Sequence, residues 1–390
     1  MEAKQEELKK HKFIIFGSYS ANTLGQIRGL GEKGIKPVVV LMHKNTFRVD
    51  KSRYIFHLFN VKDVDRGLDL IIEKYGNEQY KPFLYTDCDN VVEAFDRRYN
   101  ELVDRFFFWN AGGQGMLHQY FNKNEQIELA KKCGFRVPNT EVVKVGDLPQ
   151  SLSYPIFTKS VDSLDQYWKG NAYICHTEQE LREAYDKMDV NEILLQEYIL
   201  KKNEIPIEGI SLNGGSEVKL FVKSVNYRFT KDSYGIYRHL EPFKDVELER
   251  LVRQYIREIK YTGVFEIEFL IGPNEELFFL ETNYRITQYN FGYTKFGVNF
   301  PYLYAMSILN GSIDEQDVKY SPNMPFNVMS EFEDFRISVL HGQLSFFKWI
   351  KDVYETDCFS FYDSKDKSPF YYTLISKFVN LISKKIKHKL

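Results

Sequence analysis

The sequence has few cysteines and no long apolar run. Its 390 residues include only four cysteines, which are far apart and lack the CxxC spacing of a zinc site: Cys88, Cys133, Cys175 and Cys358. This usage is typical of a reducing compartment, and each thiol is expected to be buried and inert. No stretch approaches the ~20 apolar residues that span a bilayer, and the charged first twelve residues lack the apolar core of a signal peptide. We therefore expect a cytoplasmic protein.

The sequence also lacks an excess of charge of either sign. The formal net charge is −2, so no basic field would gather nucleic acid, and no nucleic-acid partner is expected. The 32 Phe and 27 Tyr are spread too widely for a base-stacking platform but can fill large cores. The length favours two or three domains. Nothing in the composition indicates an oligomeric state.

The first segment alternates strand and helix patterns. An apolar run at 13–16 ends in Gly17-Ser18, a helical pattern follows over 21–33, and a second buried run covers 37–41. Strand, turn, helix and strand in this order form a βαβ unit, and the same alternation continues to about residue 102. We predict an open parallel-sheet α/β domain over residues 1–118.

The turn after the first strand has two interpretations. A glycine turn before a helix can cradle a phosphate, as in dinucleotide-binding domains. Residues 17–22 read Gly-Ser-Tyr-Ser-Ala-Asn and lack the GxGxxG spacing. The pattern therefore favours a tight strand-to-helix turn, although the mouth of such a sheet often holds a substrate.

Two α+β segments are predicted next, over residues 119–200 and 201–320. In the first, an apolar strand at 155–159 ends in Lys159, and a helix is expected at 178–188. The strands expected in the second are 217–228, 236–240, 263–271 and 276–282. Its last two strands flank Gly-Pro-Asn, which is a hairpin signal.

Acidic residues follow one another on this hairpin. Because alternate residues of a strand share a face, Glu268 can lie beside Glu281 and Asn283 of the paired strand. Two carboxylates and an amide oxygen form the hard donor set that Mg²⁺ prefers. Arg285 could neutralise phosphate charge just beyond this set. The alternative is a solvated hairpin with ordinary surface charges, but carboxylates among Phe, Ile and Leu count against it.

Other candidates are ambiguous in isolation. Lys159 could bind phosphate, or simply reach solvent from the end of its strand. Lys123, at a predicted helix start, opposes the helix dipole unless an anion is bound or solvent surrounds it. The run at 194–199 is an apolar strand ending in a polar hinge, and Glu204 follows it.

Taken in order, these motifs resemble the ATP-grasp superfamily of ligases over roughly residues 10–312. The closing Glu-x-Asn-x-Arg, with an acid upstream, is the most specific part. The resemblance implies an α/β domain followed by two α+β lobes that clamp ATP. It implies phosphate contacts from Lys123 and Lys159, adenine contacts from Glu197 and the backbone of Tyr198 and Ile199, and a ribose contact from Glu204. It further implies Mg²⁺ binding by Glu268, Glu281 and Asn283, with Arg285 on the transferred phosphate.

The sequence departs from the family pattern at two places. The loop between the small lobe's strands is usually rich in glycine, but residues 160–170 hold one glycine, at the end. The usual Asn-Pro-Arg is Asn283-Tyr284-Arg285, which removes a rigid turn and keeps both functional side chains.

Residues 321–390 lie outside the resemblance and are predicted to be a helical extension. Over 371–390, apolar residues recur at helical spacing and lysines gather at the end. This pattern fits a helix docked on the core, with lysines complementing its dipole. It also fits an interfacial helix on anionic lipid, which would make the protein peripheral at the inner membrane face.

The expected function is that of an ATP- and Mg²⁺-dependent carboxylate–amine ligase of the D-aspartate-ligase-like type, acting on small molecules. Its substrate carboxylate could be held by Arg228 or Arg238, which flank a predicted strand pair. The alternatives are an enzyme like carbamoyl-phosphate synthase or a biotin-dependent carboxylase, and a nucleotide-binding regulator without catalysis. The sequence names neither the acid nor the amine.

Overall fold

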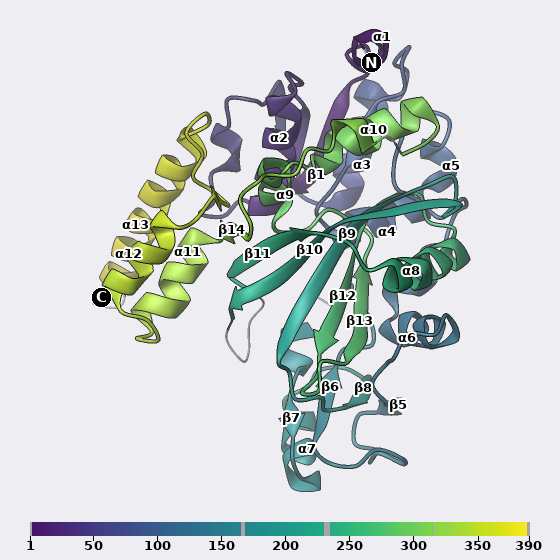
Figure 1. Ribbon diagram of the computed structural model, residues 1–390, viewed down its shortest axis with the longest axis vertical. Helices are drawn as coiled ribbons and strands as arrows, with labels where there is room; N and C mark the ends of the chain where they lie inside the picture. The colour runs from purple at the N-terminus through teal and green to yellow at the C-terminus, as the bar shows by residue number, and fades with distance from the viewer. Residues whose placement is uncertain (1, 165–167, 230–234, 314, 388–390) are drawn as a thin grey trace.

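Three β-sheets form the framework of the protein. The computed structural model describes residues 2–164, 168–229, 235–313 and 315–387. A parallel sheet lies at the N-terminal end, a seven-stranded sheet runs through the middle, and a small sheet stands at the far end (Figure 1). Residues 165–167 of the glycine-poor loop and residues 388–390 of the last predicted helix lie outside the described residues.

The N-terminal sheet has the order β3-β2-β1-β4 and is parallel throughout. Its strands are β1 (Phe13–Ser18), β2 (Val38–Met42), β3 (His57–Asn60) and β4 (Phe83–Tyr85). The helices of this region are α1 (Glu2–Leu8), α2 (Ala21–Glu32), α3 (Val64–Tyr75), α4 (Asp89–Arg97) and α5 (Tyr99–Leu102). Strands β1, β2 and β4 are almost wholly buried, as expected of a parallel sheet covered by helices.

The turn after β1 holds a carboxylate of the protein itself. Asp87 accepts hydrogen bonds from the backbone N–H of Ser18 at 3.3 Å, from Thr23 Oγ1 at 2.9 Å, and from the Ser20 hydroxyl. A Cβ at Gly17 would lie 2.3 Å from Asp87 Oδ1, so glycine is needed there. The position that a phosphate would take in a dinucleotide-binding turn is thus filled by Asp87, which favours the interpretation as a tight turn.

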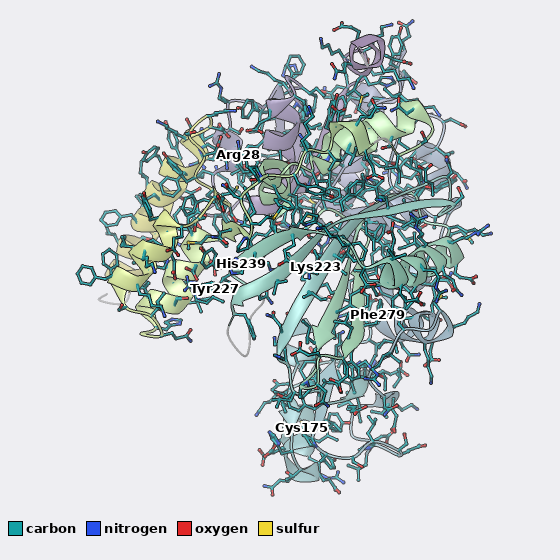
Figure 2. All side chains as sticks on the ribbon, viewed as in Figure 1. Arg28, Cys175, Lys223, Tyr227, His239 and Phe279 are labelled. Carbon is teal, nitrogen blue, oxygen red and sulfur yellow. The ribbon has the colours of Figure 1, made fainter. Side chains whose placement is uncertain are left out.

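The small lobe contains a four-stranded sheet in the order β5-β8-β6-β7. It consists of β5 (Thr140–Lys144), β6 (Ile156–Lys159), β7 (Ile174–Cys175), β8 (Glu192–Glu197) and the helix α7 (Glu178–Tyr185). Helix α6 (Lys123–Lys132) precedes it and contacts β13 of the central sheet. Cys175, labelled in Figure 2, is buried in this lobe.

The central sheet has the order β13-β12-β9-β10-β11-β14-β15. Its strands are β9 (Asn203–Leu212), β10 (Glu217–Arg228), β11 (Tyr237–Pro242), β12 (Gly263–Ile271), β13 (Leu277–Asn283), β14 (Phe326–Met329) and β15 (Cys358–Phe359). The helices α8 (Val246–Ile259), α9 (Asn290–Phe296) and α10 (Phe300–Asn310) accompany it. The predicted bounds of β10 and β12 match those observed.

The C-terminal extension is mostly helical, but it also supplies β14 and β15, which the sequence pattern did not indicate. Its helices are α11 (Glu331–Asp334), α12 (Phe346–Tyr354) and α13 (Ser368–Lys387), with a π-helical turn at Phe335–Leu340. Arg28 of α2, labelled in Figure 2, ties this extension to the N-terminal domain through a buried ion pair with Asp366 at 3.1 Å. Among the described helices, none combines the length and apolar character needed to cross a membrane.

Candidate nucleotide and metal site

A β-bulge brings the predicted metal-binding residues onto one face of the β12–β13 hairpin. Glu268 is paired with Glu281, whereas the next residue, Phe269, is paired with Phe279, so the ladder skips Leu280. Strict alternation would put Phe279 and Glu281 on the same side. The bulge instead leaves Phe279 buried in the aromatic core and lets Glu281 face Glu268.

Asn283 completes this group. It is paired with Glu266, and its amide Nδ2 donates to Glu268 Oε1 at 2.9 Å and to Glu266 Oε1 at 3.1 Å. The structure thus brings Glu268, Glu281 and Asn283 together, as the strand pattern predicted. No described residues form a group of three His, Cys, Asp or Glu side chains arranged around a common ion position; the predicted set has two carboxylates and an amide.

Two lysines from different elements meet one oxygen of Glu281. Lys123 Nζ, from the first turn of α6, and Lys159 Nζ, from the end of β6, each lie 3.6 Å from Glu281 Oε2. Lys159 Nζ also donates to the carbonyl of the bulged Leu280 at 3.4 Å. The small lobe, α6 and the central sheet therefore converge on this carboxylate.

The charges in this cluster shift one another's pKa. Burial alone would raise the pKa of Glu281, but Lys123, Lys159 and Arg285 outweigh it and lower the pKa to about 2. Burial, with the neighbouring charge of Lys123, lowers the pKa of Lys159. Glu268 behaves oppositely: burial and then the charges of Glu266 and Glu281 raise its pKa well above the ordinary value. Ionisation of Glu268 beside these carboxylates is therefore costly, and a cation bound between them would lower that cost.

Arg285 links the hairpin to the N-terminal domain. Its Nε donates to Asp89 Oδ1 at 2.8 Å, and its Nη2 donates to Asn283 Oδ1 at 3.2 Å. Burial disfavours the guanidinium, but Asp89 outweighs this effect and raises the pKa of Arg285. Asp89 begins α4, near the mouth of the parallel sheet. The Arg285 guanidinium therefore lies between the acidic cluster and the end of the parallel sheet where a substrate could enter.

The sequence analysis missed two further acids. Thr287 Oγ1 lies between them, 2.8 Å from Glu266 Oε2 and within hydrogen-bond distance of Glu208 Oε1, and its single hydrogen can be donated to one of the two. Burial, followed by the charge of Glu266, raises the pKa of Glu208 well above the ordinary value. A carboxylate within an apolar strand was the available signal: Glu208 stands in Ile-Pro-Ile-Glu-Gly-Ile, and Glu266 alternates with Phe and Ile.

The predicted adenine and ribose contacts lie at the end of β8 and the start of β9. Glu197 Oε2 accepts from Asn139 Nδ2 at 2.9 Å, and the backbone N–H of Tyr198 donates to the Pro155 carbonyl at 3.3 Å. Glu204 forms an ion pair with Lys201 at 3.0 Å. Glu204 also contributes to the raised pKa of Glu268. Glu204 is therefore near enough to the acidic cluster to act electrostatically on Glu268.

The two arginines proposed for a substrate carboxylate have different surroundings. Arg228 pairs with Asp334 at 2.8 Å and Asp352 at 2.6 Å, both in the C-terminal extension. Arg238 is buried, stacks over the Tyr289 ring at 4.6 Å, and forms no ion pair with any described residue. Its Nη1 lies 3.4 Å from Ser224 Oγ, and its Nε has no hydrogen-bond partner in the part of the chain that the structure describes.

A second polar side chain beside Arg238 also lacks partners. Asn226 is its partner in the β10–β11 register, and neither polar atom of the Asn226 amide has a hydrogen-bond partner among the described residues. Buried polar atoms without partners are costly. A polar ligand that supplied partners would remove this cost.

Solved structures provide the comparison, since no protein-family model and no curated sequence matches the chain. N5-carboxyaminoimidazole synthetase from Staphylococcus aureus aligns with a TM-score of 0.57 and 15% identity, over 76% of this chain and 77% of that one. L-Amino acid ligase from Bacillus licheniformis aligns with a TM-score of 0.60 and 15% identity, over 80% and 78%.

A third similar structure carries nucleotide. The biotin carboxylase domain of Hydrogenobacter thermophilus 2-oxoglutarate carboxylase, in complex with MgADP, ADP and bicarbonate, has a TM-score of 0.60 and 19% identity. The alignment covers 80% of this chain and 72% of that one. These likenesses, together with the mixed parallel and antiparallel sheets, confirm the predicted fold class: the chain has the ATP-grasp fold.

Proposed function

We propose that this protein is a ligase that uses ATP to phosphorylate a carboxylate and then joins the acyl group to an amine, releasing ADP and phosphate. The observation that carries the proposal is the convergence of Lys123 and Lys159 on one oxygen of Glu281, which faces Glu268 across a bulged strand pair. Two cations from separate elements around a buried acidic cluster suit a ligand with several negative charges bound through a divalent ion.

The donor set fits Mg²⁺. Glu268 and Glu281 offer carboxylate oxygens and Asn283 offers an amide oxygen. Burial and then repulsion from Glu266 and Glu281 raise the pKa of Glu268, and a cation would relieve the repulsion. Bound there, Mg²⁺ would neutralise charge on the outer phosphates of ATP. Lys123 and Lys159, now held by Glu281, would turn to the phosphates. Glu197, Tyr198 and Ile199 would meet the adenine, and Glu204 would accept from the ribose hydroxyls.

Arg285 would stabilise the group that is transferred. In the first step, a carboxylate oxygen of the substrate forms a bond to the γ-phosphorus and the bond to the ADP oxygen breaks. Stabilisation of charge on the moving group is the main source of catalysis in such a step. In the second step, the amine nitrogen bonds to the acyl carbon, phosphate leaves with an oxygen of the acid, and the amine loses a proton.

Arg238 is the better placed of the two candidate substrate arginines. It is buried, it lacks an ion-pair partner among the described residues, and the amide of its register partner Asn226 has no hydrogen-bond partner among them either. Arg228 is already held by two aspartates. We assign the acid substrate's carboxylate to Arg238 and Asn226, and we assign Arg228 to anchoring the C-terminal extension.

A second candidate reaction uses bicarbonate as the acid. Two of the similar structures are named for carboxylation chemistry, and one of them holds bicarbonate. The two candidates share the phosphorylation step and differ only in the size of the acid.

A screen for ADP release tests both. Purified protein with ATP and Mg²⁺ would be offered amino acids in pairs, and bicarbonate with single amines. ADP that appears only when an acid and an amine are both present supports the ligase, and ADP that needs bicarbonate supports the second candidate. No nucleotide turnover with any combination, together with no binding of ATP, would refute both.

A further inference from the structure

The C-terminal extension exposes many large apolar side chains. On α12, Phe347 is 85% exposed and Tyr354 is 91% exposed; on α13, Phe378 is 64% exposed. Both helices stand on the same side of the molecule, away from the small lobe (Figure 1). Apolar side chains gathered in this way on a protein surface usually mark an interaction site.

Helix α13 is attached through Phe370 in its first turn, which stacks on Phe332 at 5.3 Å, and then through polar side chains. The backbone N–H of Arg48 donates to Thr373 Oγ1 at 2.8 Å, and Thr373 is fully buried. Lys377 lies over the Phe47 ring at 4.3 Å and over the Phe332 ring at 5.3 Å. The exposed apolar residues of this helix are Tyr371, Tyr372, Leu374, Ile375, Phe378, Val379, Leu381 and Ile382.

This orientation is the reverse of that in an ordinary globular helix, which turns its apolar stripe to the core. At 3.6 residues per turn, the exposed apolar positions cover about half of the helix circumference. Docking on the protein accounts for Thr373 and Lys377 and brings Lys51 over the Tyr372 ring at 5.5 Å, but the side chains of the apolar half remain largely exposed.

Lysines outnumber acids on these two helices. Residues 368–387 contain no Asp or Glu; their lysines are Lys377, which packs on the rings of Phe47 and Phe332, and Lys384, Lys385 and Lys387. On α12, Lys348 and Lys351 are exposed and Asp352 is buried against Arg228, while Lys351 lies 3.6 Å from the exposed Glu355 that follows the helix. An apolar face flanked by lysines is typical of a helix that lies in the interface of an anionic membrane.

We propose that the exposed faces of α12 and α13 bind the surface of an anionic lipid bilayer. A second copy of the chain fits less well: in a two-fold dimer the same patch meets itself, so the lysines of α13 would face those of its partner. Anionic headgroups instead complement these lysines while the apolar side chains enter the acyl boundary. This inference does not depend on the proposed ligase activity.

Vesicle flotation of the full chain tests the proposal. The vesicles are phosphatidylcholine with phosphatidylglycerol, compared with phosphatidylcholine alone, at low and high salt. The test variant is Phe378→Ser with Ile382→Ser, since both side chains are exposed and their loss should leave the fold intact. The matched control is Val246→Ser, which removes an exposed apolar side chain from α8 in another part of the molecule.

We expect wild type and Val246→Ser to float with the anionic vesicles at low salt and to be released as salt screens the lysines. The double variant should lose at least about 10-fold in bound fraction, with an unchanged circular dichroism spectrum. Absence of flotation by folded wild type would overturn the proposal. A wild-type dimer in sedimentation that the double variant abolishes, without flotation, would assign this surface to a second copy instead.

Discussion

Replacing Glu281 by Gln removes one negative charge from between two lysines and keeps the shape of the side chain. The two Nζ atoms, each 3.6 Å from Glu281 Oε2, would then face each other without the carboxylate that joins them. In the proposed site the same change removes a metal ligand. We therefore expect Glu281→Gln to lower both the stability of the free protein and its turnover.

The expected loss of stability follows from the lowered pKa of Glu281. A fall from the ordinary value of 4.5 to about 2 corresponds to on the order of 3 kcal/mol, at ~1.4 kcal/mol per unit. Because the folded state lowers this pKa, the contribution is present above pH 4.5 and is lost as the pH falls toward 2. The free energy of unfolding at neutral pH should therefore drop by about 3 kcal/mol. We expect kcat to fall at least ~100-fold, as when charge stabilisation at the reacting group is lost.

Thermal unfolding with ATP, with and without Mg²⁺, separates the two effects. A ligand at 100 times its Kd stabilises the folded state by ~2.7 kcal/mol, so Mg²⁺ should add to the ATP-dependent rise in Tm of wild type and add little for Glu281→Gln. Glu258→Gln is the matched control, because its carboxylate also pairs with a lysine, Lys132 at 3.1 Å, but on the surface. If Glu281→Gln kept wild-type turnover and the full Mg²⁺-dependent shift, the metal assignment would be refuted.

Two more predictions concern buried charges elsewhere. Arg238→Lys should raise the KM for the acid about 10-fold or more and change kcat less, because lysine cannot reproduce the guanidinium contacts; an unchanged KM would exclude Arg238 from substrate binding. Burial, partly offset by backbone hydrogen bonds, raises the pKa of Glu331 to about 7. The folded state therefore binds this proton more tightly, and stability should fall by up to ~3 kcal/mol as the pH rises from 4.5 to 7. Denaturant titrations across this range should show that Glu331→Gln lacks this component, and an identical pH profile would contradict the reasoning.

Structural features that depend on a few neighbouring residues were predicted best from the sequence. The β12–β13 hairpin and its acids could be read from alternation and a turn motif, because both act over a few residues. Strand β9 was missed: Pro206 and two glutamates interrupt its apolar run, although it lies between β10 and β12 and carries Glu208. Its pairing on both sides, rather than its composition, makes it a strand.

Contacts between distant segments could not be predicted. The partner of Arg285 is Asp89, which is 196 residues away, and nothing in either local sequence joins them. Arg228 is the last residue of its strand, as Lys159 is of β6. Its partners are nevertheless Asp334 and Asp352, in a segment outside the family resemblance. The bulge at Leu280 was equally invisible, because it depends on the register of two strands.

The order of bond breaking provides the most direct test of the proposed mechanism. An acid labelled with ¹⁸O in its carboxylate would be turned over with the amine that the screen identifies, and the products would be analysed by mass spectrometry. Phosphorylation of the acid predicts ADP, together with phosphate that carries one oxygen from the acid. Release of AMP and pyrophosphate, or of unlabelled phosphate while the amide forms, would contradict the proposal that Arg285 and the Glu268–Glu281 pair serve transfer of the γ-phosphoryl group.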